Sequence, residues 1–144
     1  MKETDPRMHS AEHLLTGVLV ATFGMGRPFT THLEKKKSKA DYRFGRTLTD
    51  AEARGVEAMV NAQIARDLSV REEFLPRAEA ERIFNLSRLP EEAGDTVRIV
   101  RIGDFDACPC SGQHVVSTRE IGRFNLISWS YENEALRIRF RLEP

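Results

Sequence analysis

Two histidines stand four positions apart near the start of the chain, in the segment HSAEH. Side chains at positions i and i+4 of an α-helix project from the same face, so His9 and His13 can bind one metal ion together. Far along the chain, His114 follows Cys110 by four positions in CSGQH. The four side chains offer the nitrogen and sulfur donors that zinc prefers. The pattern therefore predicts a zinc site formed by His9, His13, Cys110 and His114.

Each half of this pattern also has an interpretation without a metal, since a histidine can be hydrogen-bonded in a core and a buried cysteine acts as a small apolar residue. The letters HSAEH further fit the inverted zinc-protease motif, with Glu12 as the base. We favour a solvated helix position for Glu12, because such a protease needs a far larger chain and a carboxylate ligand. Cys108 is too near Cys110 for an unstrained disulfide, which favours a reducing compartment and a ligand role for one thiol.

Hydrophobic periodicity and capping residues predict the elements that position these side chains. Asp5 and Pro6 precede a helix expected from Arg7 to Phe23. A capping box that begins at Thr49 predicts a second long helix. A short helix is expected over 76–84 and a loop over 85–94. Strands are predicted over 30–36, 39–44, 70–75, 96–102, 122–130 and 135–142, the last two joined by a turn at 132–133.

Two long helices and strands in adjacent pairs predict an α+β fold, a two-layer sandwich with the helices on one face of a largely antiparallel sheet. A chain of 144 residues with 40% hydrophobic residues suits a single domain. No apolar run approaches about 18 residues. Charges begin at Lys2, so we expect no signal peptide, no membrane association and a cytoplasmic location. Because the formal net charge is zero, any nucleic acid must bind to local basic patches.

The order of the motifs is similar to that of a known family. The segments HSAEHLL, LPRAEAERIF, DTVRIVRIGD, CSGQHV and STREIG resemble the editing domain of alanyl-tRNA synthetase, and more closely its free-standing short relative, AlaX. The resemblance implies one AlaX-like trans-editing domain over residues 1–144. Two departures stand out: CSGQH replaces the CGGTH that is usual in the synthetases, and FTTH replaces their Gly-Ser segment after the first helix.

The resemblance implies a zinc-dependent aminoacyl-tRNA deacylase that hydrolyses mischarged tRNA, above all Ser-tRNA(Ala). His9, His13, Cys110 and His114 match the family's metal ligands. Thr30 matches a threonine near the metal, for which we expect recognition of the serine hydroxyl. A threonine chosen only for its β-propensity is an equally open interpretation. Gln113 would bond the substrate or simply shape the loop.

Two basic clusters are the candidate contacts for tRNA phosphates. One surrounds the expected turn between the first two strands, and the other alternates along the last strand: Lys35, Lys36, Lys37, Lys39, Arg137, Arg139 and Arg141. Such residues also keep the edges of sheets soluble, so their presence fits both interpretations.

Two other classes of function fit the same residues. One is an RNA- or tRNA-binding module with a structural zinc and no catalysis. The other is a metal hydrolase that acts on a different ester or amide. An open metal position beside a polar pocket favours catalysis, whereas a basic surface favours a nucleic-acid substrate. The sequence also leaves open whether a bound metal would orient the substrate or activate a water.

Overall fold

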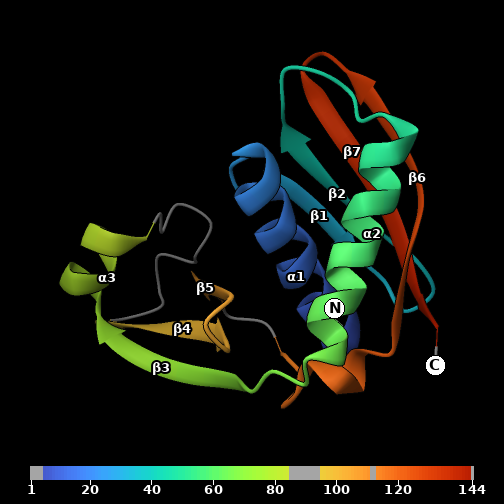
Figure 1. Ribbon diagram of the computed structural model, residues 1–144. Coiled ribbons are helices and arrows are strands. Elements are labelled where there is room, and N and C mark those ends of the chain that lie inside the picture. Colours follow the sequence, from blue (N-terminus) through green and yellow to red (C-terminus); the bar gives the residue numbers. More distant parts are fainter. Residues whose placement is uncertain (1–4, 85–94, 111–112, 144) are drawn as a thin grey trace.

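Two helices pack against a four-stranded antiparallel sheet, and a three-stranded antiparallel sheet stands to one side of them (Figure 1). The structure is a computed structural model and describes residues 5–84, 95–110 and 113–143. The predicted α+β class and antiparallel pairing are confirmed. The strands form two sheets, however, where the sequence predicted one. The loop predicted over 85–94 lies outside the described residues.

The helix that carries both early histidines is α1, Pro6–Phe23. It starts one residue before the predicted Arg7, next to the predicted cap: the side chain of Asp5 accepts a hydrogen bond from the Arg7 amide at 2.9 Å. It ends at Gly24, which adopts a left-handed conformation with φ 70°. Between these caps most of its side chains are buried, so the helix lies inside the molecule rather than on its surface.

The second long helix is α2, Asp50–Ala65, which lies beside α1 on the same face of the larger sheet (Figure 1). Its predicted capping box is present: the Thr49 hydroxyl accepts from the Glu52 amide, and the Glu52 carboxylate accepts from the Thr49 amide. The buried side of α2 carries small and branched apolar residues, namely Ala53, Val56, Val60 and Ile64.

The larger sheet has the strand order β1-β2-β7-β6. Its strands are β1 Thr30–Leu33, β2 Ser38–Arg43, β6 Arg123–Glu132 and β7 Ala135–Glu143. The hairpin of β6 and β7 turns at Asn133 and Glu134, which both have positive φ, one residue later than predicted. Alternation along β7 is as expected, because Leu136, Ile138 and Phe140 are fully buried against the helices.

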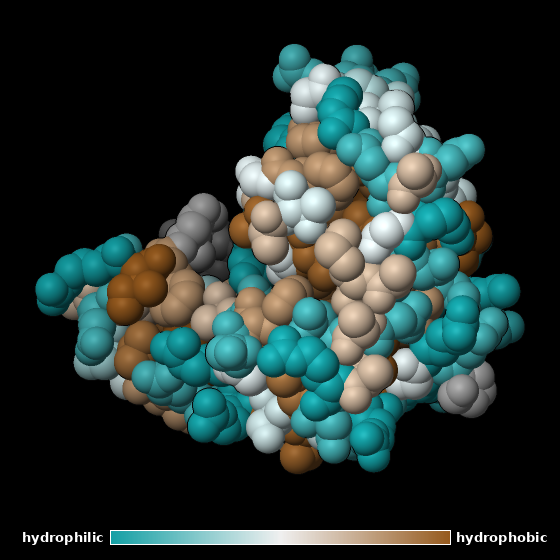
Figure 2. Space-filling view, in the orientation of Figure 1, coloured by the Kyte–Doolittle hydropathy of each residue, from teal (hydrophilic) through white to brown (hydrophobic). Residues whose placement is uncertain are grey.

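The smaller sheet contains β3 Val70–Pro76, β4 Thr96–Ile102 and β5 Asp106–Pro109, in that order. A short helix, α3 Arg77–Ile83, packs on it over a separate small core of Ala80, Val97 and Ile99. A 3-10 helix, η2 Thr118–Ile121, follows before β6. Strand β5 was not predicted. Figure 2 shows apolar surface over this part of the molecule, where Phe74 and Ile83 are exposed.

The turn between β4 and β5 rests directly on α1. The ring of Phe105 lies over Gly17, so close that a Cβ added to this glycine would be 2.5 Å from the ring. A side chain larger than glycine at position 17 would push the turn away from the helix. Gly17 and Phe105 therefore bring the end of β5 next to the histidines of α1.

Among the described residues, no helix is long and apolar enough to cross a membrane.

Replacing Thr49 with alanine should lower the free energy of unfolding by about 1 kcal/mol, because the N-terminus of α2 loses its side-chain cap. Urea denaturation followed by circular dichroism measures this change. Thr47→Ala is the matched control, since Thr47 lies outside the capping box and its backbone oxygen, which accepts from Arg46, survives the substitution. Equal stability of the two variants would contradict the role of the capping box.

Candidate metal centre

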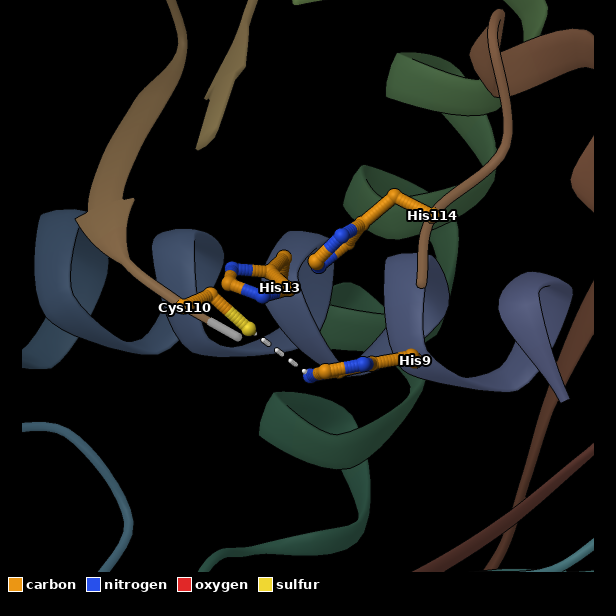
Figure 3. Close-up of side chains that lie close together, drawn as sticks. All are labelled: His9, His13, Cys110 and His114. Carbon is orange, nitrogen blue, oxygen red and sulfur yellow. Dashed lines mark hydrogen bonds between the residues drawn. The ribbon is translucent and has the colours of Figure 1, made fainter. Parts of the chain in front are cut away.

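The four side chains predicted as ligands lie together between α1 and the segment that follows β5 (Figure 3). One donor atom from each of His9, His13, Cys110 and His114 falls within 4.8 Å of the others. The three imidazole rings have centroids 4.4 to 5.1 Å apart, and the Cys110 Sγ is 3.2 Å from His9 Nε2. The structure thus brings together all four residues that the spacing selected.

Backbone contacts fix the two later residues over α1. The Cys110 amide donates to the Arg98 carbonyl at 3.2 Å, and the Arg98 Nε donates to the Cys110 carbonyl at 2.8 Å. Beyond Gln113, the Val115 amide donates to the Ser10 hydroxyl on α1 at 3.0 Å. Ser10 is fully buried and lies between the two histidines in sequence. The HSAEH segment therefore supplies both candidate ligands and the hydrogen bond that holds the opposite segment near them.

The donors fit a zinc ion by their chemistry and by their unmet hydrogen bonds. His9 Nδ1 and both ring nitrogens of His114 are buried and have no hydrogen-bond partner among the described residues. Buried polar nitrogens normally have a partner, and each one without costs about 1–3 kcal/mol. A metal ion in the centre of the cluster removes part of this cost. Three imidazoles and one thiolate form a set that suits zinc in closed tetrahedral sites.

Electrostatics prepare Cys110 as a thiolate. Burial raises the pKa of its thiol, but the nearby imidazoles of His114, His13 and His9 outweigh this effect and lower the pKa to about 3. Burial, together with the neighbouring histidines, lowers the pKa of His114 despite the opposing effect of Cys110. At neutral pH the cluster therefore holds an anionic sulfur and a neutral His114 imidazole, which are the forms that bind metal.

A second group of side chains contacts the Nδ1 side of the His13 ring. His13 Nδ1 lies 3.1 Å from Cys108 Sγ and 3.4 Å from Asp106 Oδ2, so Nε2 is the nitrogen available to an ion. Asp106 in turn accepts from the Arg27 guanidinium at 2.6 Å. Burial lowers the pKa of His13, yet hydrogen bonds with Asp106 and the cysteines raise it well above its usual value, so an ion that binds Nε2 would displace a proton from this imidazole. Local spacing carries no signal for Asp106 and Arg27, because they lie 79 positions apart.

Glu12 corrects one prediction, because it is buried and not solvated. Its side chain is 7% exposed, and its carboxylate accepts a hydrogen bond from the Thr16 hydroxyl at 2.7 Å. Thr16 also shares a 2.8 Å hydrogen bond with the Tyr42 hydroxyl of β2. Position i+4 on the same helix was the available signal for this pair. The bond from Thr16 to Tyr42 of another element is not revealed by the helix sequence.

The structure does not add Thr30 to the four-residue cluster. Thr30 pairs with Asp41 of β2, so its side chain lies on the sheet face opposite Ala40, which contacts the helices. Arg27, three residues earlier, contacts Asp106 beside the cluster, so the chain enters β1 from the edge of the site. Gln113 is exposed next to His114. Both substrate roles stay predictions.

The seven basic residues proposed for tRNA contact occupy different settings. Arg137 makes two hydrogen bonds with Asp41, at 2.7 and 3.0 Å, and its charge is thereby balanced. The remaining six form no ion pair with any described residue: Lys35, Lys36, Lys37, Lys39, Arg139 and Arg141. Their contacts with tRNA stay a prediction.

Part of the chain matches a known family of domains. Residues 97–139 match the family described as "Threonyl and Alanyl tRNA synthetase second additional domain". The matched range runs from β4 into β7 and includes Cys110 and His114. Two of the four candidate ligands, Cys110 and His114, therefore lie within the stretch that matches this family.

Similarity to curated proteins extends over most of the chain. It is 34% identical over 129 residues to an alanine–tRNA ligase of Acidithiobacillus ferridurans, a match that covers 85% of this chain and 14% of the relative. The alanine–tRNA ligase of Treponema denticola is 34% identical over 123 residues, which cover 81% of this chain and 20% of the relative. That of Coxiella burnetii is 35% identical over 125 residues, which cover 86% of this chain and 14% of the relative. The chain thus spans only 14% to 20% of the length of these relatives. It is similar to a portion of alanyl-tRNA synthetases, and the resemblance to these enzymes that its motifs predicted is confirmed.

Removing a ligand should empty the candidate site. The protein purified with zinc should hold about one ion per chain, and His9→Ala or Cys110→Ala should lower this content sharply. Cys108→Ser is the matched control, because the serine hydroxyl can still bond His13 Nδ1 while the Cys110 thiolate remains. Elemental analysis of the dialysed proteins gives the metal content. Loss of zinc in Cys108→Ser but not in Cys110→Ala would show that the other thiol is the ligand.

Asp106→Asn should weaken zinc binding by about 10- to 100-fold, because the carboxylate that orients His13 is removed. Competition with a chelator measures the affinity without reference to any activity. Asp104→Asn is the control, since its side chain is 88% exposed and faces Arg66 rather than a histidine. An unchanged affinity in Asp106→Asn would mean that His13 is held in place by packing alone.

Proposed function

We propose that this protein is a zinc-dependent hydrolase that deacylates mischarged tRNA, with Ser-tRNA(Ala) as its main substrate. The convergence of His9, His13, Cys110 and His114 is the observation that carries the proposal. It occurs in a chain related to alanine–tRNA ligases, whose name states that they join alanine to tRNA. The proposal includes an AlaX-like role for residues 1–144 as one editing domain in the cytoplasm.

The choice of serine follows from the limits of discrimination by size. An alanine-binding pocket cannot strongly reject serine, because one added hydroxyl on a small side chain costs at most a few kcal/mol. A second site can use the opposite asymmetry. If it is built to hydrogen-bond the hydroxyl, alanine leaves a polar group of the site without a partner and binds poorly. A second site of this kind removes seryl esters and spares alanyl esters.

The residues around the cluster are suited to holding the end of such a substrate. A zinc ion held by His9, His13, Cys110 and His114 would supply positive charge beside the ester that joins the amino acid to the ribose. Gln113 is exposed beside His114, and its amide can donate a hydrogen bond to the substrate or accept one from it. Asp106 and Arg27 keep His13 oriented while the ester is bound. Thr30, at the start of β1, is proposed to bond the serine hydroxyl.

The direct test is incubation of the purified protein with tRNA(Ala) charged with serine, glycine or alanine, followed by measurement of released amino acid. We expect fast release of serine and little release of alanine, and loss of activity after zinc is removed. Tight binding of tRNA without any release would instead favour an RNA-binding module with a structural metal. Release from small esters but not from charged tRNA would favour a hydrolase of another ester or amide.

Thr30→Val should reduce the preference for seryl over alanyl esters by about 1–3 kcal/mol, because valine keeps the shape and removes the hydroxyl. Deacylation rates on both charged tRNAs give this difference. Thr31→Val tests the other face of the same strand, which is turned toward the helices, so a reduced preference in Thr31→Val and not in Thr30→Val would assign the role to Thr31 instead. Equal losses on both substrates would mean that Thr30 only packs. Unchanged rates in Thr30→Val would remove it from the site.

A further inference from the structure

A hollow of about 230 Å³ opens on the larger sheet, away from the candidate metal centre. Its walls come from β1, β2, β7 and the turn between the first two strands: His32, Glu34, Lys37, Ser38, Lys39 and Arg139. Three of these residues form one row across the sheet, because His32 pairs with Lys39 and Lys39 pairs with Arg139. Directly paired residues project from the same face, so the row is a consequence of strand register.

The row lies on the face of the sheet that the helices do not cover. Its neighbours in sequence, Ala40 and Ile138, are fully buried on the other face, where Tyr42 contacts Thr16 of α1. Alternation along the strands therefore turns Lys39 and Arg139 to solvent. Substitutions in the hollow can alter binding there without touching the four candidate metal ligands.

The charges in the hollow are unbalanced. It contains three permanent cations, Lys37, Lys39 and Arg139, against the single carboxylate of Glu34. None of the three cations forms an ion pair with a described residue. Arg137, two positions along the same strand, is by contrast fully engaged by Asp41. Arg139 makes long hydrogen bonds, of 3.4 and 3.5 Å, with two serine hydroxyls of β6.

We propose that this hollow binds a phosphate of an RNA backbone, a step that rests on the proposed function for the identity of the RNA as tRNA. Its volume is below the roughly 300–1,000 Å³ of pockets that enclose whole small molecules, so it suits one group rather than a complete nucleotide ligand. Arginine binds phosphate through two parallel N–H donors, and lysine adds a point charge. His32 adds a polar ring at the rim of the same hollow, and the buried Ser38 hydroxyl holds the backbone of Glu34 in the adjoining turn.

Lysines on a strand edge can also serve only to keep a sheet soluble. If the lysines only keep the sheet soluble, every exposed lysine of the turn should have the same effect on RNA binding. If the hollow binds a phosphate, only the lysines that line it should matter. Lys37 and Lys39 line it, while Lys35 and Lys36 do not. The two pairs carry equal charge within a short stretch of the chain, so they contribute nearly the same long-range field. A difference between them in RNA binding reports an interaction with a specific phosphate.

The test compares Lys37→Gln/Lys39→Gln with the matched double variant Lys35→Gln/Lys36→Gln in the full chain. Uncharged tRNA(Ala) is the probe, and its affinity is measured by fluorescence anisotropy from about 50 to 200 mM salt. The first variant should bind about tenfold or more weakly, as expected when a hydrogen bond to a charged group is removed. Its dependence of log affinity on log salt should flatten by about 0.7–0.9 for each phosphate that is no longer neutralised. The second variant should stay within about twofold of the unaltered protein.

Equal affinities of the two double variants overturn the proposal, as does an unaltered protein that does not bind tRNA at low salt. Lys37→Gln alone is a further check, because it is an exposed turn residue whose replacement should not affect folding, and it should also flatten the salt dependence. Hydrolysis of a seryl ester of adenosine by the unaltered protein tests the proposed function separately. That ester has no phosphate backbone, so its result is independent of the hollow.

Discussion

The arrangement of the molecule depends on the burial of α1 on two sides. One side packs on the larger sheet through residues such as Leu14 and Leu15, which are fully buried. Another side receives Phe105 on Gly17 and the Val115 amide on Ser10. A helix held from two directions has little freedom to rotate. This restraint fixes where His9 and His13 point, and it explains why local sequence spacing was a reliable guide to their position.

Features set by neighbouring residues were predicted well. The caps at Asp5 and Thr49 define the starts of α1 and α2 because a side chain and its backbone partner lie within three positions. The alternating sequence of β7 also predicted which of its residues are buried and that its arginines lie on the other face, because successive side chains of a strand point to opposite faces. The ligand set was predicted from two local pairs, although the pairs are joined only in the folded chain. Their nitrogen and sulfur donors linked the two pairs into one zinc-type set, and the family resemblance matched the same four residues.

Features set by distant residues were not predicted. The division of the strands into two sheets depends on which strands pair, and hydrophobic periodicity does not specify partners. Strand β5 is four residues long and contains cysteine and proline, so it carries a weak strand signal. Glu12 resembles a surface residue in its own helix, but it is buried, and its partner Thr16 is bonded to Tyr42 of β2. In each case the missing information lies far away in the chain.

The contact between Cys110 and His9 joins residues 101 positions apart. A covalent bridge closing a loop of that length would stabilise a protein by about 4.7 kcal/mol in the chain-entropy model, by restricting the unfolded chain. An ion shared by α1 and the segment after β5 acts on the unfolded state in a similar way, and its binding is linked to folding. It would also tie the smaller sheet to the helix that rests on the larger one. The fraction of the protein that is folded, and not only its activity, would then depend on the concentration of metal in the cell.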